Sequence, residues 1–213
     1  MKRRALLATI GAGTVPAAGC TGVRAPEAGD AVTETPTAED REKRLRISSV
    51  DAVPADAPLV PTVEVIQPAI TPDRLARVRV SLANTAGSAV WNSNVRIRAF
   101  DRFITQAGPN EQQLVLLDPT ERYPTVSAGC WRVDLDDLEL NFAYTDVVTD
   151  VRYSAGETRV AVFDVYGHPE NTGPCLPPGE YRIESTYRIS MDEKTDSIDW
   201  TYDWGFTIEI VDS

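Results

Sequence analysis

The chain has 213 residues, of which 42% are hydrophobic and 25% are charged. A chain of this length can bury a core without depending on disulfides, and the composition excludes a disordered protein and a polytopic membrane protein. Asp and Glu number 32 against 21 Lys and Arg, which gives a formal net charge of −11. A free nucleic-acid-binding protein is therefore not expected, because binding to phosphates requires a basic surface.

The N-terminus has the organisation of an export signal. Lys2, Arg3 and Arg4 form a basic segment, residues 5–15 are apolar but too few to span a bilayer, and residues 16–20 are mostly small. This order of basic, apolar and small residues predicts a signal peptide.

Two features of this signal indicate how the chain is exported and held. The pair Arg3-Arg4 resembles a twin-arginine signal, and Ala17-Ala18-Gly19-Cys20 resembles a lipobox, with Ala17 in the place of the usual Leu. We therefore predict a signal peptide over residues 1–19 and lipidation of Cys20. The alternative for Cys20 is an ordinary free thiol.

Residues 20–44 are rich in Pro, Thr and acidic residues and contain almost no large apolar side chain. They are predicted to form a disordered, lipid-anchored tether that holds the following domain about 25 to 30 Å from the membrane. The predicted location is the extracellular face of the cytoplasmic membrane. Removal of residues 1–19 takes away three basic residues and no acid, so the side-chain charge becomes −14 (18 minus 32).

From Leu45 onward, apolar residues mostly alternate with polar ones, and residues 45–213 are predicted to form one domain. In residues 74–82, alternation puts one apolar face opposite one polar face. The apolar face is Ala76, Val78, Val80 and Leu82, and the polar face is Arg77, Arg79 and Ser81. Residues 84–88 follow as a turn. The other strand candidates are residues 63–67, 95–99, 113–117, 130–135, 138–144, 158–166, 180–190 and 201–211. Many short strands joined by turns predict an all-β, antiparallel sandwich.

The segment Leu176-Pro177-Pro178-Gly179-Glu180-Tyr181-Arg182 places a Pro-Gly turn before a strand that contains Tyr. It resembles the penultimate strand of immunoglobulin-like domains. Residues 75–210 as a whole resemble the immunoglobulin-like domains of secreted haloarchaeal lipoproteins and, more distantly, the sandwich of BsuPI-type proteinase inhibitors. The resemblance implies an immunoglobulin-like β-sandwich and hardly implies an activity.

Cys130 and Cys175 remain as a pair if Cys20 is lipidated. In an exported protein they are predicted to form a disulfide. The alternative is a copper or zinc site, which requires further soft ligands, and His168 and Met191 are the only ones in the mature chain. We expect no metal and no cofactor.

The aromatic series Trp200, Tyr202, Trp204 and Phe206 continues in register with two isoleucines, which predicts a buried face. The alternative is an exposed platform on which sugar rings stack. Trp131 is expected to point away from Cys130, because neighbours in a strand point to opposite faces.

Two acidic runs are candidates for Ca²⁺ binding through carboxylate oxygens, although neither has the spacing of a calcium loop. The alternative for both is a solvated acidic surface. The first run is Asp134, Asp136, Asp137 and Glu139, and the second is Asp192, Glu193, Asp196 and Asp199.

Arg77 and Arg79 share one strand face, and Arg96 and Arg98 share another. Together they are a candidate surface for an anion or an acidic partner. The simpler alternative is pairing across strands with acids such as Glu184.

Catalytic motifs for nucleophilic, metal-dependent or phosphate chemistry are absent from the sequence, and His168 is expected to be solvated in a turn. We therefore expect a non-catalytic cell-surface lipoprotein that binds an envelope protein or glycan. One alternative is an extracellular protease inhibitor that uses the long connections 106–112 and 119–129. Another is a small sugar- or ester-processing hydrolase.

The basic residues are 18 Arg and only three Lys, which together with the acidic excess is typical of proteins from salt-loving archaea. The alternative is an acidic protein from a GC-rich genome. Molar salt shortens the screening length to about 3 Å and so relieves the self-repulsion of an acidic protein.

The first testable prediction concerns this charge. The melting temperature of the purified protein should rise as NaCl is raised from about 0.1 M to about 3 M, because its acidic groups repel one another less at high ionic strength. Differential scanning fluorimetry measures the shift, and KCl at equal ionic strength should reproduce it. A flat melting temperature would contradict the halophilic interpretation.

Overall fold

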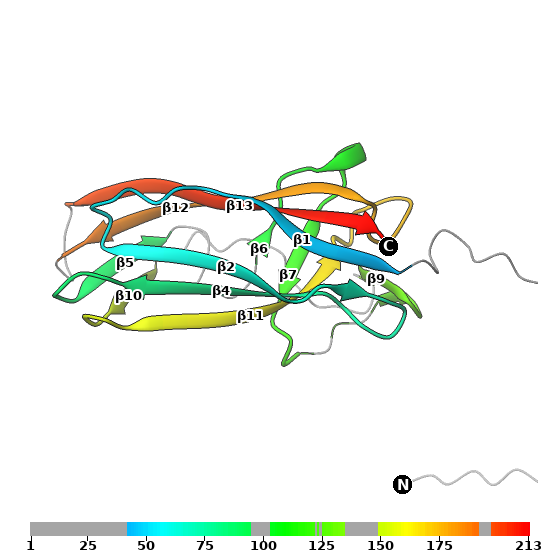
Figure 1. Cartoon of the computed structure of the whole chain (residues 1–213), viewed down its shortest axis with the longest axis horizontal. Coiled ribbons are helices and arrows are strands. Elements are labelled where there is room, and N and C mark those ends of the chain that lie inside the picture. The colour runs from blue at the N-terminus through cyan, green and yellow to red at the C-terminus, as the bar shows by residue number, and fades with distance from the viewer. Residues whose placement is uncertain (1–41, 95–102, 122, 124, 135–148, 192–196) are drawn as a thin grey trace, which may run out of the picture. The chain divides into compact units, whose positions relative to one another are not determined.

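The computed structural model describes residues 42–94, 103–121, 123, 125–134, 149–191 and 197–213 (Figure 1). The chain divides into two compact units, residues 1–35 and 36–213, and every described residue belongs to the second. In the described part, the only helical element is the short 3-10 turn η1 (Pro109–Glu111). No helix there has the length and hydrophobicity that crossing a bilayer requires.

One sheet has six strands in the order β10-β5-β12-β13-β1-β3. The long antiparallel hairpin of β12 and β13 lies at its centre and pairs Tyr181 with Ile208 and Tyr187 with Tyr202. The strands are β1 (Lys43–Val50), β3 (Ala69–Ile70), β5 (Val90–Asn94), β10 (Thr149–Tyr153), β12 (Gly179–Ser190) and β13 (Trp200–Asp212).

The second sheet has the order β2-β4-β11-β7-β6, and β9 joins it through a parallel pairing of Arg132 with Gly167. A short β8 forms an antiparallel pair with β9. The strands are β2 (Leu59–Gln67), β4 (Arg77–Asn84), β6 (Phe103–Ile104), β7 (Leu114–Leu117), β8 (Thr125–Ser127), β9 (Cys130–Val133) and β11 (Thr158–Gly167).

The strand order is that of an immunoglobulin-like sandwich. Strands β2-β4-β11-β7 reproduce the A-B-E-D order of the first sheet of such a domain, and β5-β12-β13 reproduce the C-F-G order of the second. The predicted all-β sandwich is therefore confirmed. In this scheme β12 is the penultimate strand, as the Pro-Gly turn before Tyr181 indicated.

The core lies between the two sheets, which Figure 1 shows as layers. In β4 the inward side chains Val78, Val80 and Leu82 are at most 2% exposed. Opposite them, Trp204 and Phe206 of β13 are also buried. Burying each such side chain contributes about 2 to 3 kcal/mol to folding.

The predicted aromatic core of β13 is confirmed. Tyr202 is 8% exposed, and its ring stacks on the ring of Tyr187 with the centroids 5.2 Å apart. Tyr187 in turn meets Trp204 edge to face. The alternative of an exposed aromatic platform is wrong for Tyr202, Trp204 and Phe206, and Trp200 at the start of β13 is half-buried.

Most predicted strands that fall in the described part are present, with end points shifted by a few residues. The candidates 95–99 and 138–144 lie outside the described residues. Strand β1 begins at Lys43, two residues before the predicted start of the domain at Leu45. The strands that the sequence did not predict are β1, β3, β5, β6, β8 and β10. The predicted turn after β4 is present, and Asn84 closes it by accepting from the Ala86 N–H and donating to the Ser88 carbonyl.

A buried tyrosine fixes the start of β12. The Tyr181 hydroxyl donates to the Pro177 carbonyl at 2.7 Å, which is the tyrosine corner of immunoglobulin-like domains. Between these residues, Gly179 has φ +145°, and a Cβ atom there would lie 2.1 Å from Pro109 Cγ. Glycine is therefore required for the chain to turn beside η1.

Replacing the Tyr181 hydroxyl should destabilise the domain. We expect Tyr181→Phe to lower the free energy of unfolding by about 1 to 3 kcal/mol, because the buried Pro177 carbonyl loses its donor. Tyr153→Phe is the matched control. Among the described residues the buried Tyr153 hydroxyl has no hydrogen-bond partner, so its loss should be neutral or stabilising. Urea denaturation of both variants measures the difference, and equal stability of the two would contradict the assigned role.

Candidate binding cleft at the disulfide end of the sandwich

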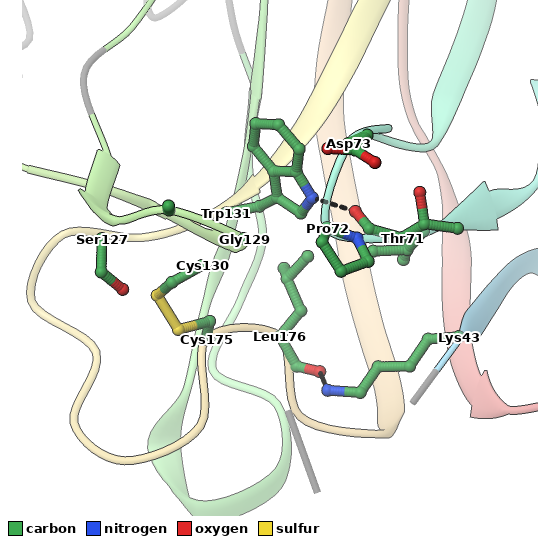
Figure 2. Close-up of a pocket in the computed structure, with 12 residues that line it drawn as sticks. Lys43, Thr71, Pro72, Asp73, Ser127, Gly129, Cys130, Trp131, Cys175 and Leu176 are labelled. Carbon is green, nitrogen blue, oxygen red and sulfur yellow. Dashed lines mark hydrogen bonds between the residues drawn. A yellow bond between two sulfur atoms is a disulfide. The ribbon is translucent and has the colours of Figure 1, made fainter. Parts of the chain in front are cut away.

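A cleft of about 260 Å³ lies at the end of the sandwich where β1 begins. Four segments that are distant in sequence enclose it (Figure 2). They are the start of β1 at Lys43, residues 70–73 from the end of β3 into the turn before β4, residues 127–131 of the β8–β9 hairpin, and residues 175–176.

The disulfide forms one wall of this cleft. Cys130 of β9 is bonded to Cys175, and their Cα atoms lie 5.4 Å apart, so the predicted disulfide is confirmed. The close approach of Cys175 to β11 depends on Gly167, where a Cβ atom would lie 2.3 Å from the Cys175 carbonyl oxygen. Arg132 supports the same segment by donating to the Asn171 carbonyl at 2.9 Å.

The turn between β3 and β4 forms the opposite wall. Thr71 and Arg74 exchange two backbone hydrogen bonds of 2.9 and 3.2 Å. The indole N–H of Trp131 donates to the Thr71 carbonyl at 2.7 Å, and its ring meets Tyr166 edge to face. Trp131 and Cys130 point to different sides of β9, as the alternation of a strand predicts, and both border the cleft (Figure 2).

Lys43 supplies a buried positive charge to the cleft. In β1 its side chain occupies the same inward row as Leu45, and the residue is 8% exposed. Burying an ammonium group is costly unless it is hydrogen-bonded. Lys43 Nζ donates to the Leu176 carbonyl at 2.8 Å, which holds the side chain along the floor of the cleft.

Asp73 supplies the opposite charge. It is exposed in the turn between β3 and β4, and Figure 2 shows Thr71 and Pro72 between it and Lys43. The cleft therefore carries a cation and an anion at separate places, together with the apolar surfaces of Trp131 and Pro72.

Arg77 and Arg79, two residues of the candidate anion surface, are paired with acids on neighbouring strands. Arg77 forms a salt bridge with Asp164 of β11, and this contact raises the pKa of Arg77. Arg79 forms one with Glu64 of β2. For these two arginines, the alternative of pairing with acids across strands is therefore confirmed, and not the anion surface.

Glu184, the example that we gave of such an acid, is not the partner that pairs with Arg77 or Arg79. Glu184 contacts Arg182 on its own strand, and Arg182 also forms a salt bridge with Asp51. Arg96 and Arg98, the other two residues of the candidate anion surface, lie outside the described residues.

The calcium candidates are mostly outside the described part. Asp134 follows β9, and Asp199 accepts a hydrogen bond from the Met191 N–H at 2.8 Å. Among the described residues, no three or more His, Cys, Asp or Glu are grouped so that they could hold a metal ion. The candidates outside the described residues are Asp136, Asp137, Glu139, Asp192, Glu193 and Asp196.

The prediction that His168 is solvated was wrong. His168 is 8% exposed, and this burial lowers its pKa. Its backbone N–H donates to the Gln113 carbonyl at 3.0 Å, and its imidazole Nδ1 accepts from the Glu170 backbone N–H at 3.3 Å. The segment after β11 is hydrogen-bonded to Gln113, the residue before β7, so His168 is a structural part of the sandwich.

The connection 106–112, a candidate inhibitory loop, forms a closed turn. Gly108 N–H donates to the Gln112 carbonyl at 2.7 Å, and Asn110 and Glu111 have left-handed φ values of 54° and 62°. A segment that enters a protease cleft as a substrate does is expected to be extended. This turn therefore gives the inhibitor hypothesis no support.

The fold and the cleft define a disulfide-containing, immunoglobulin-like sandwich with a small mixed-polarity site at one end. No family model, curated protein or solved structure matches the chain. The sequence indicated the disulfide and the orientation of Trp131, but it carried no local signal for Lys43 and Asp73, which only the fold places at one cleft.

The disulfide should contribute much of the stability of this end. Joining residues separated by 45 positions stabilises a fold by up to about 4 kcal/mol, so Cys130→Ser together with Cys175→Ser should lower the free energy of unfolding by about 2 to 4 kcal/mol. Urea denaturation with and without a reductant measures the effect. Reductant should destabilise the parent protein and leave the double variant unchanged, and an equal response of both would contradict a stabilising disulfide.

Proposed function

We propose that the chain is an exported, lipid-anchored surface protein whose sandwich domain binds another component of the cell envelope without catalysing a reaction. The observation that most supports export is the Cys130–Cys175 disulfide, because disulfides persist in oxidising compartments outside the cytoplasm. The signal-like residues 1–19 and the lipobox-like Cys20 support the same location.

A binding role is supported by what the described charged groups do. Arg46 binds Glu209 through two hydrogen bonds of 2.7 and 2.9 Å, and Arg159 binds Glu157. The first pair joins two neighbouring strands, and the second joins two residues of one segment. Such pairs stabilise the sheets. In the described lining of the cleft, the two cysteines are joined to each other and Lys43 donates to a backbone carbonyl, which supports recognition rather than covalent chemistry.

The position of the cleft also supports this proposal. Its floor is Lys43, the first residue of β1, and residues 21–42 connect that strand to Cys20. Loops at one end of an immunoglobulin-like sandwich are common binding surfaces, because a rigid pair of sheets positions them. The proposed binding surface is the set of turns around this cleft.

The test of the location compares the wild-type chain with a Cys20→Ala variant, both produced in an archaeal host that grows in molar salt. The wild-type protein should be found in the membrane fraction after a high-salt wash, and Cys20→Ala should appear in the medium, because its lipid attachment site is gone. Immunoblotting of the fractions and the mass of the mature N-terminus give the readout.

The control for this test is Thr21→Ala, which changes the neighbouring residue, keeps the cysteine, and should stay in the membrane fraction. Wild-type protein that is recovered inside cells with residues 1–19 still attached would overturn the proposed location.

A further inference from the structure

We propose that the cleft is a binding site for one neutral sugar ring, which deepens the proposed function and rests on it by naming the chemistry of the envelope component. The inference stands on three properties of the cleft. They are its opposite charges, its apolar surfaces and its small, rigid volume.

The charges disfavour a ligand that carries a single charge, and they suit one that presents hydroxyl groups. Lys43 places a positive charge on the floor, and Asp73 places a negative charge in the turn between β3 and β4. An anionic ligand would meet the Asp73 carboxylate, and a cationic ligand would meet the Lys43 ammonium. Hydroxyl groups avoid both penalties, because they can donate to a carboxylate and also accept from donors.

The apolar surfaces match the carbon-bound hydrogens of a sugar ring. Trp131 and Pro72 line the cleft next to the polar groups, and the exposed Ser127 hydroxyl lies on the β8–β9 hairpin. An aromatic ring offers a large contact area at a low cost in conformational entropy. For Trp131 this cost is reduced further, because its N–H is fixed to the Thr71 carbonyl and its ring is held against Tyr166.

The volume limits the ligand to about one ring. A cleft of about 260 Å³ is slightly smaller than the usual range for drug-sized ligands. Its walls are fixed by the disulfide and by the paired backbone bonds of Thr71 and Arg74, so binding requires little ordering of the protein. A ring of about a dozen non-hydrogen atoms with ordinary ligand efficiency corresponds to a Kd of about 1 mM.

The experiment is saturation-transfer difference NMR on the full-length chain, purified in a detergent without a sugar headgroup and kept in about 3 M NaCl. The probes are the methyl glycosides of glucose, galactose and mannose and free N-acetylglucosamine, each at about 10 mM. Glycine and inorganic phosphate are the zwitterionic and anionic comparison probes. At least one sugar should receive saturation with a Kd of about 1 mM, and the two comparison probes should not.

Two variants connect the signal to the cleft. Asp73→Asn should weaken sugar binding about tenfold, because a hydrogen bond to a charged acceptor becomes one to a neutral acceptor. Ser127→Trp should abolish binding, because an exposed position on the rim receives a bulky side chain. Asp56→Asn is the matched control, since Asp56 is an exposed acid in the turn between β1 and β2, and it should bind as the parent does.

Three outcomes would overturn the inference: no sugar signal from the parent protein, a signal that Ser127→Trp and Asp73→Asn retain, or saturation of glycine or phosphate but not of a sugar. Each variant is checked for an unchanged melting temperature, so that loss of binding is not loss of folding. These outcomes do not depend on where the protein is found, so failure of this inference is distinguishable from failure of the proposed lipid-anchored location.

Discussion

The packing of alternate side chains between two twisted sheets is the constraint on which the other features of this domain depend. Strand β13 lies between β12 and β1, and β11 lies between β4 and β7, so the inward rows of both are enclosed. A register slip of one residue in β13 would turn Trp204 and Phe206 to the outer face and bring Asp203 into the core. The tyrosine corner and the disulfide stabilise a strand arrangement that this packing already defines.

The acidic excess of the chain has to be accommodated on the outer faces of the same sheets. Arg46, Arg77 and Arg79 each lie opposite an acid on a neighbouring strand, which removes local repulsion between carboxylates. An exposed pair such as Arg79 and Glu64 contributes about 0 to 1 kcal/mol, so it organises the face more than it stabilises the fold. With 32 acidic and 21 basic residues, pairing leaves the protein strongly negative.

The sequence predicted those parts of the fold in which one local pattern decides the structure. Alternation predicted β4 and β13, and the Pro-Gly turn before Tyr181 predicted the penultimate strand. Strand β5 was missed because its inward row contains Asn92, which is 3% exposed and interrupts the apolar pattern. The burial of His168 was missed because it depends on contacts that are distant in sequence. Both the His168 backbone N–H and the Asn171 side chain donate to the carbonyl of Gln113, the residue before β7.

The cleft was missed because its residues also come together only in the folded domain. Where a strand extends past the overlap of the two sheets, its inward-facing side chains no longer meet apolar side chains of the other sheet. Burying a polar side chain there costs less free energy than it does in the core. Lys43 occupies that position in β1, where the Leu176 carbonyl accepts from its ammonium. Because Leu176 follows Cys175, the disulfide that holds this segment to β9 also positions the acceptor. In the sequence pattern, Lys43 only interrupts the apolar row of β1. In the folded sandwich, it forms the floor of a polar cleft.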